Sequence, residues 1–168
     1  MKGISIRKAV LQVQQLSERA VLPSYAHEGD AGLDLFADED LMLQVGQRAL
    51  ISTGIAIELP VGTEAQIRPR SGLALNHGIT VLNAPGTIDA GYRGEIKVLL
   101  INFGQAPFQI ERGMKIAQMV IAEVLRAKIQ VRKQLGGSKR GAAGFGSTGD
   151  TRLNTIEEGR GPSSINLT

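Results

Sequence analysis

The chain has 168 residues, which suits one domain of ordinary size, and it has no cysteine, so disulfide frameworks and thiolate metal sites are excluded. Aromatic residues make up only 4% while glycine accounts for 21 residues, so aliphatic side chains must form the core between many turns. The formal net charge is +3 and the basic residues are scattered, which argues against nucleic-acid binding and suits an anionic small molecule.

The N-terminal residues lack the uninterrupted apolar run of a signal peptide, and no segment reaches the length of a membrane span. We therefore expect a cytoplasmic protein with no membrane partner.

The first predicted elements lie within residues 31–78. Asp34 stands in a short alternating stretch, residues 31–35, and residues 55–59 alternate in the manner of a half-buried strand. A short helix of about two turns follows, which Ser71 can cap and Gly78 can end in the left-handed conformation.

Strand signals continue after this helix. Residues 83–95 hold two turn clusters around a short extended piece, which predicts a hairpin. We interpret residues 95–102 and 115–125 as strands that are apolar on both faces, although periodicity alone leaves a buried helix open for the second. The alternation of residues 129–132 predicts a further strand. Glycine and proline separate these runs at short intervals, as in a sandwich or barrel, so residues 1–135 are expected to form one all-β domain.

Beyond Leu135 the composition changes to Gly, Ser, Lys and Arg. We interpret residues 136–150 as an arm without its own core and residues 151–168 as a disordered tail. Residues 139–149 place two basic residues and one aromatic in a glycine-rich frame, which is typical of a phosphate-binding loop with a stacking ring, although the spacing of a Walker loop is missing. A flexible linker is the alternative interpretation.

Two further segments could carry chemistry. Arg70, Ser71 and Gly72 would bring a guanidinium, a hydroxyl and free N–H groups together as an anion site, unless they form only a capped helix with an exposed arginine. In the predicted hairpin, main-chain groups could bind the edge of a base, Asp89 could deprotonate a water and Tyr92 could form a flat wall. Taken alone, each residue is more often a turn former or a packing residue.

These segments occur together and in one order, and the set resembles the five motifs of the trimeric dUTPase family. The motifs are residues 31–35 (AGLDL), 69–74 (PRSGLA), 83–95 (NAPGTIDAGYRGE), 112–119 (RGMKIAQM) and 140–149 (RGAAGFGSTG). The resemblance implies a jelly-roll or β-barrel subunit of the β-clip type, in a homotrimer whose sites are shared between subunits. It also implies hydrolysis of dUTP to dUMP and pyrophosphate by water attack on the α-phosphorus, which limits uracil incorporation into DNA and supplies dUMP for dTMP synthesis.

The same resemblance assigns roles to individual residues. Asp89 would be the catalytic base, main-chain groups at Asn83, Thr87 and Ile88 would read uracil, and Tyr92 would reject ribose and thymine. The remaining nucleotide contacts would come from residues of the other motifs and of the following strand: Arg70, Ser71, Gly72, Lys97, Gln118, Arg140, Phe145, Gly146, Ser147 and Thr148. Phe145 would stack over the base. Mg²⁺ would be held mainly by the triphosphate, with Asp34 contacting its water shell.

Two residues depart from the family pattern. Ala143 replaces the usual glycine of the fifth motif, where a left-handed backbone would cost about 1–2 kcal/mol. Lys115 replaces an arginine that is frequent in the fourth motif, so a point charge stands in place of a bidentate fork. Two alternative functions remain open: a dCTP deaminase on a similar fold, and a regulatory module that keeps the pocket and acts by binding a protein.

Overall fold

The computed structural model describes residues 9–142, which fall into two units. The first unit ends at Ala127 and holds every helix and strand of the described residues. The second begins at Lys128 and contains only turns and irregular chain as far as Ala142. This boundary lies earlier than the expected one at Leu135. The elements are β1 (Gln12–Gln15), β2 (Leu33–Phe36), β3 (Leu41–Leu43), β4 (Arg48–Glu58), β5 (Thr63–Arg68), α1 (Ser71–His77), β6 (Ile79–Val81), β7 (Gly86–Asp89), β8 (Glu95–Asn102), β9 (Phe108–Ile110) and β10 (Lys115–Glu123).

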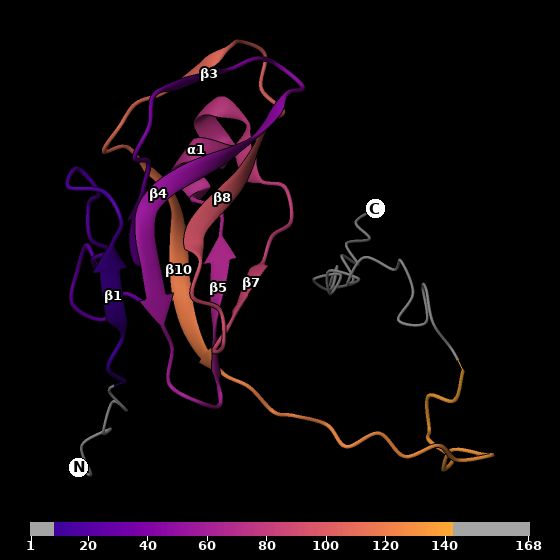
Figure 1. The fold of residues 1–168 in the computed structure, drawn as a ribbon. Helices are drawn as coiled ribbons and strands as arrows, with labels where there is room; N and C mark the ends of the chain where they lie inside the picture. Colours follow the sequence, from indigo (N-terminus) through magenta and orange to yellow (C-terminus); the bar gives the residue numbers. More distant parts are fainter. Residues whose placement is uncertain (1–8, 143–168) are drawn as a thin grey trace, which may run out of the picture. The chain divides into compact units, whose positions relative to one another are not determined.

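Two four-stranded sheets make up most of the first unit, one in the order β1-β4-β8-β6 and the other in the order β2-β10-β5-β7 (Figure 1). A separate two-stranded ribbon joins β3 to β9. The strand pairs are antiparallel, and many neighbours are distant in sequence, which is the connectivity of Greek-key and jelly-roll sandwiches. The predicted all-β class with one short helix is therefore confirmed.

The core consists of aliphatic side chains from both sheets. Ile51, Ile96 and Val98 of the first sheet and Leu35 and Met119 of the second belong to one buried cluster. Burying each such side chain contributes about 1.5–3 kcal/mol, so the two sheets stabilise each other through this shared layer. The core agrees with the low aromatic content of the sequence: among the described residues, no aromatic side chain belongs to the buried hydrophobic set.

Several predicted elements are confirmed. β4 includes most of residues 55–59, β8 spans residues 95–102, and residues 115–123 form the strand β10 rather than a helix. The helix α1 ends as expected at Gly78, whose φ is 69°. Ser71 is not the cap, however: it is the first helical residue, Arg70 occupies the cap position, and no side chain caps the helix. With seven residues, this helix is too short to cross a membrane, and residues 9–142 contain no other.

Two further expectations are wrong. Residues 83–95 do not form a hairpin, because β7 pairs with β5 in the second sheet whereas β8 pairs with β4 and β6 in the first. The turn signals were correct, but the chain crosses between sheets instead of returning along the same one. Residues 129–132 form no strand, and Ile129 and Val131 are 89% and 97% exposed. Alternation over four residues indicates a strand only where a sheet covers the apolar face.

Candidate active site

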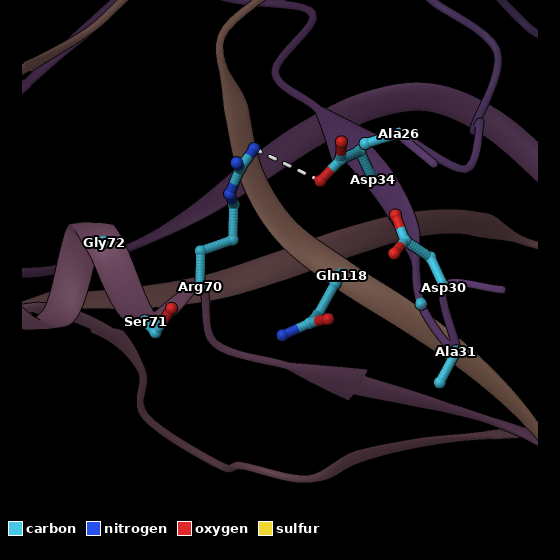
Figure 2. A pocket seen from close by; sticks show the side chains of 9 residues that line it. Ala26, Asp30, Ala31, Asp34, Arg70, Ser71, Gly72 and Gln118 are labelled. Carbon is cyan, nitrogen blue, oxygen red and sulfur yellow. Dashed lines mark ion pairs between the residues drawn. The ribbon is translucent and has the colours of Figure 1, made fainter. Parts of the chain in front are cut away.

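A first cavity of about 310 Å³ opens beside the start of α1 (Figure 2). It is lined by residues of β2, β10, the cap and first turn of α1 and the loop before β2: Ala26, Asp30, Ala31, Gly32, Asp34, Arg70, Ser71, Gly72 and Gln118. Five of these residues were predicted from three separate motifs. The fold therefore gathers the first, second and fourth motifs around one space.

Strand pairing explains this convergence. β10 lies between β2 and β5, so Gln118 stands opposite Asp34 on one side and opposite Arg68 on the other. The amide of Gln118 donates a hydrogen bond of 2.9 Å to the carbonyl of Pro69, which ties β10 to the chain leading into α1. Gly32 leaves room for that amide, because a Cβ at this position would lie 2.6 Å from Oε1 of Gln118.

Asp34 is the charged centre of this cavity. It is only 8% exposed, and its two carboxylate oxygens contact two cations, Arg70 at 3.2 Å and Lys115 at 2.7 Å. In Figure 2 the guanidinium of Arg70 points toward Asp34 across the cavity wall. Burying a carboxylate without partners is costly, and the two cations supply those partners to Asp34.

A β-bulge brings Lys115 to this carboxylate. The register between β10 and β2 shifts between Lys115 and Ala117, and two consecutive residues, Ile116 and Ala117, are buried. In a regular strand, positions 115 and 118 would face opposite sides. The bulge adds one residue between them, so Lys115 and Gln118 face the same side of the sheet, and Lys115 lies on the side of Asp34.

The cap and first turn of α1 present hydrogen-bond donors to the same cavity. Since no side chain caps α1, its first N–H groups have no acceptor from the cap residue, and the hydroxyl of Ser71 lies beside them. A Cβ at Gly72 would meet nothing within 4 Å, so the cavity can admit a ligand up to the backbone there. With the guanidinium of Arg70, these groups are suited to bind an anion with several oxygen atoms.

A second cavity of about 550 Å³ lies against β7 and β8. Its lining residues are Leu50, Thr87, Ile88, Asp89, Tyr92, Glu95 and Lys97. Within residues 9–142, β7 is an edge strand that pairs with β5 alone, so its outer N–H and C=O groups are available to a ligand. The hairpin prediction was wrong, but the unpaired main-chain groups that it was meant to supply are present on this edge.

Polar contacts hold three of the residues that line the second cavity, Tyr92, Glu95 and Lys97, in place. The hydroxyl of Tyr92 donates to the carbonyl of Glu95 at 3.1 Å. The carboxylate of Glu95 accepts a hydrogen bond of 3.0 Å from the N–H of Gly54 and pairs with Lys97 at 3.3 Å. Asp89, at the end of β7, is exposed and can therefore reach a water or a substrate.

The structure groups the predicted residues into two sets and leaves some outside them. The first cavity collects Asp34, Arg70, Ser71, Gly72 and Gln118, and the second collects Thr87, Ile88, Asp89, Tyr92 and Lys97. The two cavities share no lining residue.

Other predicted residues lie outside both sets. Asn83 lines neither cavity and lies in an exposed turn. Arg140 belongs to the second unit, and Phe145, Gly146, Ser147 and Thr148 lie outside the described residues, as does Ala143.

Several lining residues were missed from the sequence. Leu50 and Glu95 line the second cavity, and Asp30 lines the first. Leu50 is a large apolar residue that is 57% exposed, which becomes informative only once the fold is known. Glu95 stands in the third motif, and its spacing of two residues from Lys97 on one strand was the available signal.

The donor set fits a magnesium ion that is carried by a ligand. Within residues 9–142 no group of three or more His, Asp or Glu residues could hold a metal ion. Asp34 borders the first cavity, but both its oxygens already contact cations, which suits contact through a water shell. Mg²⁺ commonly keeps several waters and takes its other ligands from one carboxylate and substrate phosphates.

Comparison with known proteins identifies relatives along most of the chain. The dUTPase family model matches residues 18–149. A deoxyuridine 5'-triphosphate nucleotidohydrolase of Clostridium acetobutylicum is 60% identical over 139 residues, which is 83% of this chain and 96% of the relative. A protein of the same name from Clostridium tetani is 62% identical over the same shares.

Two solved structures of similar fold come from bacteriophages. The dUTPase of Staphylococcus bacteriophage 80alpha with dUPNHPP has a TM-score of 0.80 and 28% identity, over 84% of this chain and 99% of that one. A point mutant of the dUTPase from phage phi11 of S. aureus, described with a structural Mg(II) ion, has a TM-score of 0.71 and 28% identity, over 75% of this chain and 98% of that one. The two-sheet architecture is therefore the jelly-roll β-clip fold of these enzymes, and the chain belongs to the dUTPase family.

Proposed function

We propose that this chain hydrolyses dUTP to dUMP and pyrophosphate, at sites that are completed between the subunits of a homotrimer. The observation that carries the proposal is the presence of two complementary half-sites. One is a polar cavity with hydrogen-bond donors from Arg70, Ser71 and Gln118, and the other is a cavity bordered by an edge strand that ends in Asp89.

The separation of the half-sites supports a shared site. A deoxynucleoside triphosphate needs a surface for its base and sugar and a surface for its phosphates, and within the described residues these surfaces are two cavities with no common residue. A threefold arrangement can bring the phosphate cavity of one subunit to the base cavity of the next. Closed rotational symmetry of this kind repeats one interface and one composite site per subunit.

The base and sugar are assigned to the second cavity. Outer main-chain groups of β7, at Thr87 and Ile88, would hydrogen-bond the edge of uracil, with Asn83 at the turn before this strand contributing a further contact. Tyr92 would press its ring against the sugar and the 5-position of the base. A 2'-hydroxyl or a 5-methyl group would then collide with a fixed wall, which rejects ribonucleotides and thymine nucleotides.

Asp89 is assigned as the general base. Its carboxylate would accept a proton from a water as the water oxygen bonds to the α-phosphorus, and the bond from that phosphorus to the bridging oxygen would break. Pyrophosphate would leave with the electron pair. Positioned base catalysis of this kind contributes about 10²–10⁴-fold in rate.

The phosphates are assigned to the first cavity. Arg70, Ser71, Gly72 and Gln118 would bind the oxygens, and Arg140, Phe145, Gly146, Ser147 and Thr148 would close over the nucleotide from the arm. Cationic and N–H donors that already point at the phosphates stabilise charge on the leaving group without reorganisation. Mg²⁺ on the triphosphate, with Asp34 contacting its water shell, would neutralise part of the phosphate charge.

The decisive experiment measures pyrophosphate release from dUTP, dTTP, UTP and dCTP with the full chain and Mg²⁺. Rapid release from dUTP alone is expected, and addition of a chelator should suppress it. Ammonia release from dCTP would instead identify a deaminase. A purified chain that binds dUTP and hydrolyses none of the four would indicate a regulatory module.

A further inference from the structure

The ring of Tyr92 lies across a glycine two residues further along the chain. If Gly94 carried a Cβ, that atom would lie 2.6 Å from Cζ of Tyr92 and 3.1 Å from Cε2, and closer still to the hydroxyl oxygen. Real Cβ atoms do not approach other atoms so closely, so the two cannot coexist in this arrangement. The outer end of the ring therefore occupies the space that any side chain at position 94 would need.

The backbone does not require glycine at this position. Gly94 is absent from the glycines with positive φ, so its conformation is open to other residues. The atoms that a Cβ would meet are all at the far end of the Tyr92 side chain, which is 45% exposed and can rotate away. A methyl group at position 94 would thus move the ring while leaving the sheets intact.

The seated position of this ring is connected to the second cavity. The Tyr92 hydroxyl donates to the carbonyl of Glu95 at 3.1 Å, and Tyr92 and Glu95 both line the cavity with Lys97. A ring displaced from Gly94 loses that hydrogen bond together with its fixed place in the wall.

We infer that Gly94 is a specificity-determining positioning residue: its missing side chain seats the Tyr92 ring as the rigid wall that separates dUTP from dTTP and UTP. This inference rests on the proposed function, because that function supplies the nucleotides that the wall would discriminate. The seating itself is a property of the chain alone, which makes it separately testable.

The first experiment compares kcat/KM for dUTP, dTTP and UTP in the full chain and in Gly94→Ala. The preference for dUTP is expected to fall roughly tenfold or more, since removing one contact of about a methyl group's size from a pocket changes discrimination by about 10–200-fold. Turnover of dUTP itself should be largely kept, and the thermal unfolding temperature should not change. An unchanged preference, or an equal loss for all three nucleotides, would overturn the inference.

Gly91→Ala is the matched control. Gly91 lies in the same loop, lacks a positive φ, and a Cβ there would meet nothing within 4 Å. It should keep the preference of the unchanged chain. If Gly91→Ala relaxed the preference as much as Gly94→Ala, loop rigidity rather than the seated ring would be responsible, and the inference would fail.

A double-mutant cycle tests whether Gly94 acts through Tyr92. Tyr92→Ala should admit dTTP and UTP, and adding Gly94→Ala to it should have little further effect, because the ring is already absent. Additive losses would show that position 94 acts by another route.

A structural readout separates this inference from the proposed function. The chain has two tyrosines, so ring resonances labelled with ¹³C can be assigned with Tyr25→Phe. The Tyr92 resonances should move in Gly94→Ala and stay in place in Gly91→Ala, whether or not dUTP is hydrolysed. Unmoved resonances in Gly94→Ala would reject the seating, whereas moved resonances in a chain that leaves dUTP intact would reject only the enzymatic proposal.

Discussion

Lys115 and Asp34 form an ion pair of 2.7 Å, and the bulge in β10 is what allows them to meet. Arg70 contacts the other oxygen of the same carboxylate at 3.2 Å. Asp34 is therefore divided between two cations, so Lys115 limits how far the carboxylate neutralises Arg70. Because the guanidinium of Arg70 pairs with only one oxygen of Asp34, its other N–H groups can donate hydrogen bonds to a phosphate.

This division predicts that Lys115→Met weakens nucleotide binding. With the lysine gone, Asp34 would turn fully toward Arg70, and KM for dUTP should rise roughly tenfold with little change in kcat, given the usual strength of hydrogen bonds to charged groups. Lys115→Arg should restore most of the affinity because it keeps the charge. Steady-state kinetics of the three proteins tests this, and equal KM values in all three would show that Lys115 has no influence on the cavity.

Asp89→Asn should separate binding from chemistry. A lost general base acts mainly in the transition state, so kcat should fall by about 10²–10⁴-fold while the dissociation constant for a non-hydrolysable dUTP analogue changes little. Calorimetry and single-turnover rates measure the two quantities independently. Parallel losses in affinity and rate would assign Asp89 to substrate binding instead.

The elements that sequence predicted best are those with long hydrophobic patterns. The runs that became β8 and β10 are apolar on both faces, and a chain with few aromatics and many turns has few ways to bury them except between two sheets. The convergence of Asp34, Arg70 and Gln118 followed from the order of the family motifs rather than from any pattern visible in one segment.

The parts that sequence missed depend on partners far along the chain. Whether β7 pairs with β8 or with β5 is decided by which sheet has a free edge, and no local signal in residues 83–95 carries that information. The position of Lys115 was hidden for a similar reason, since a bulge reverses the face of a residue without leaving a glycine or proline to mark it. For residues 129–132 the sequence predicted a strand that does not exist, because the alternating pattern is present but no sheet covers its apolar side chains.

Asn102 offers a test of stability that leaves both cavities untouched. Its buried amide donates to the carbonyls of Leu43 and Ala106, each at 2.9 Å, and accepts from the N–H of Gly104 at 2.8 Å. Asn102→Leu should lower the free energy of unfolding by about 1–3 kcal/mol, the cost of leaving the buried carbonyl of Leu43 without a partner, because the groups of Ala106 and Gly104 are less buried and can bond to water. Urea denaturation measures the loss. Gln14→Ala, at an exposed position of β1, should stay within about 0.5 kcal/mol of the unchanged chain.

Removing residues 139–168 should depress turnover and leave the folded unit intact. The unit that holds both sheets ends at Ala127, and within residues 128–142 no strand or helix would be cut by the truncation. The thermal unfolding temperature and the number of subunits in the assembled protein should therefore remain as in the full chain, while hydrolysis of dUTP falls because the arm no longer closes over the phosphates. Arg140→Ala in the full chain should reproduce part of that loss. Dissociation of the truncated protein into single subunits would show instead that this segment holds the assembly together, and its assignment as a nucleotide-binding arm would need to be replaced.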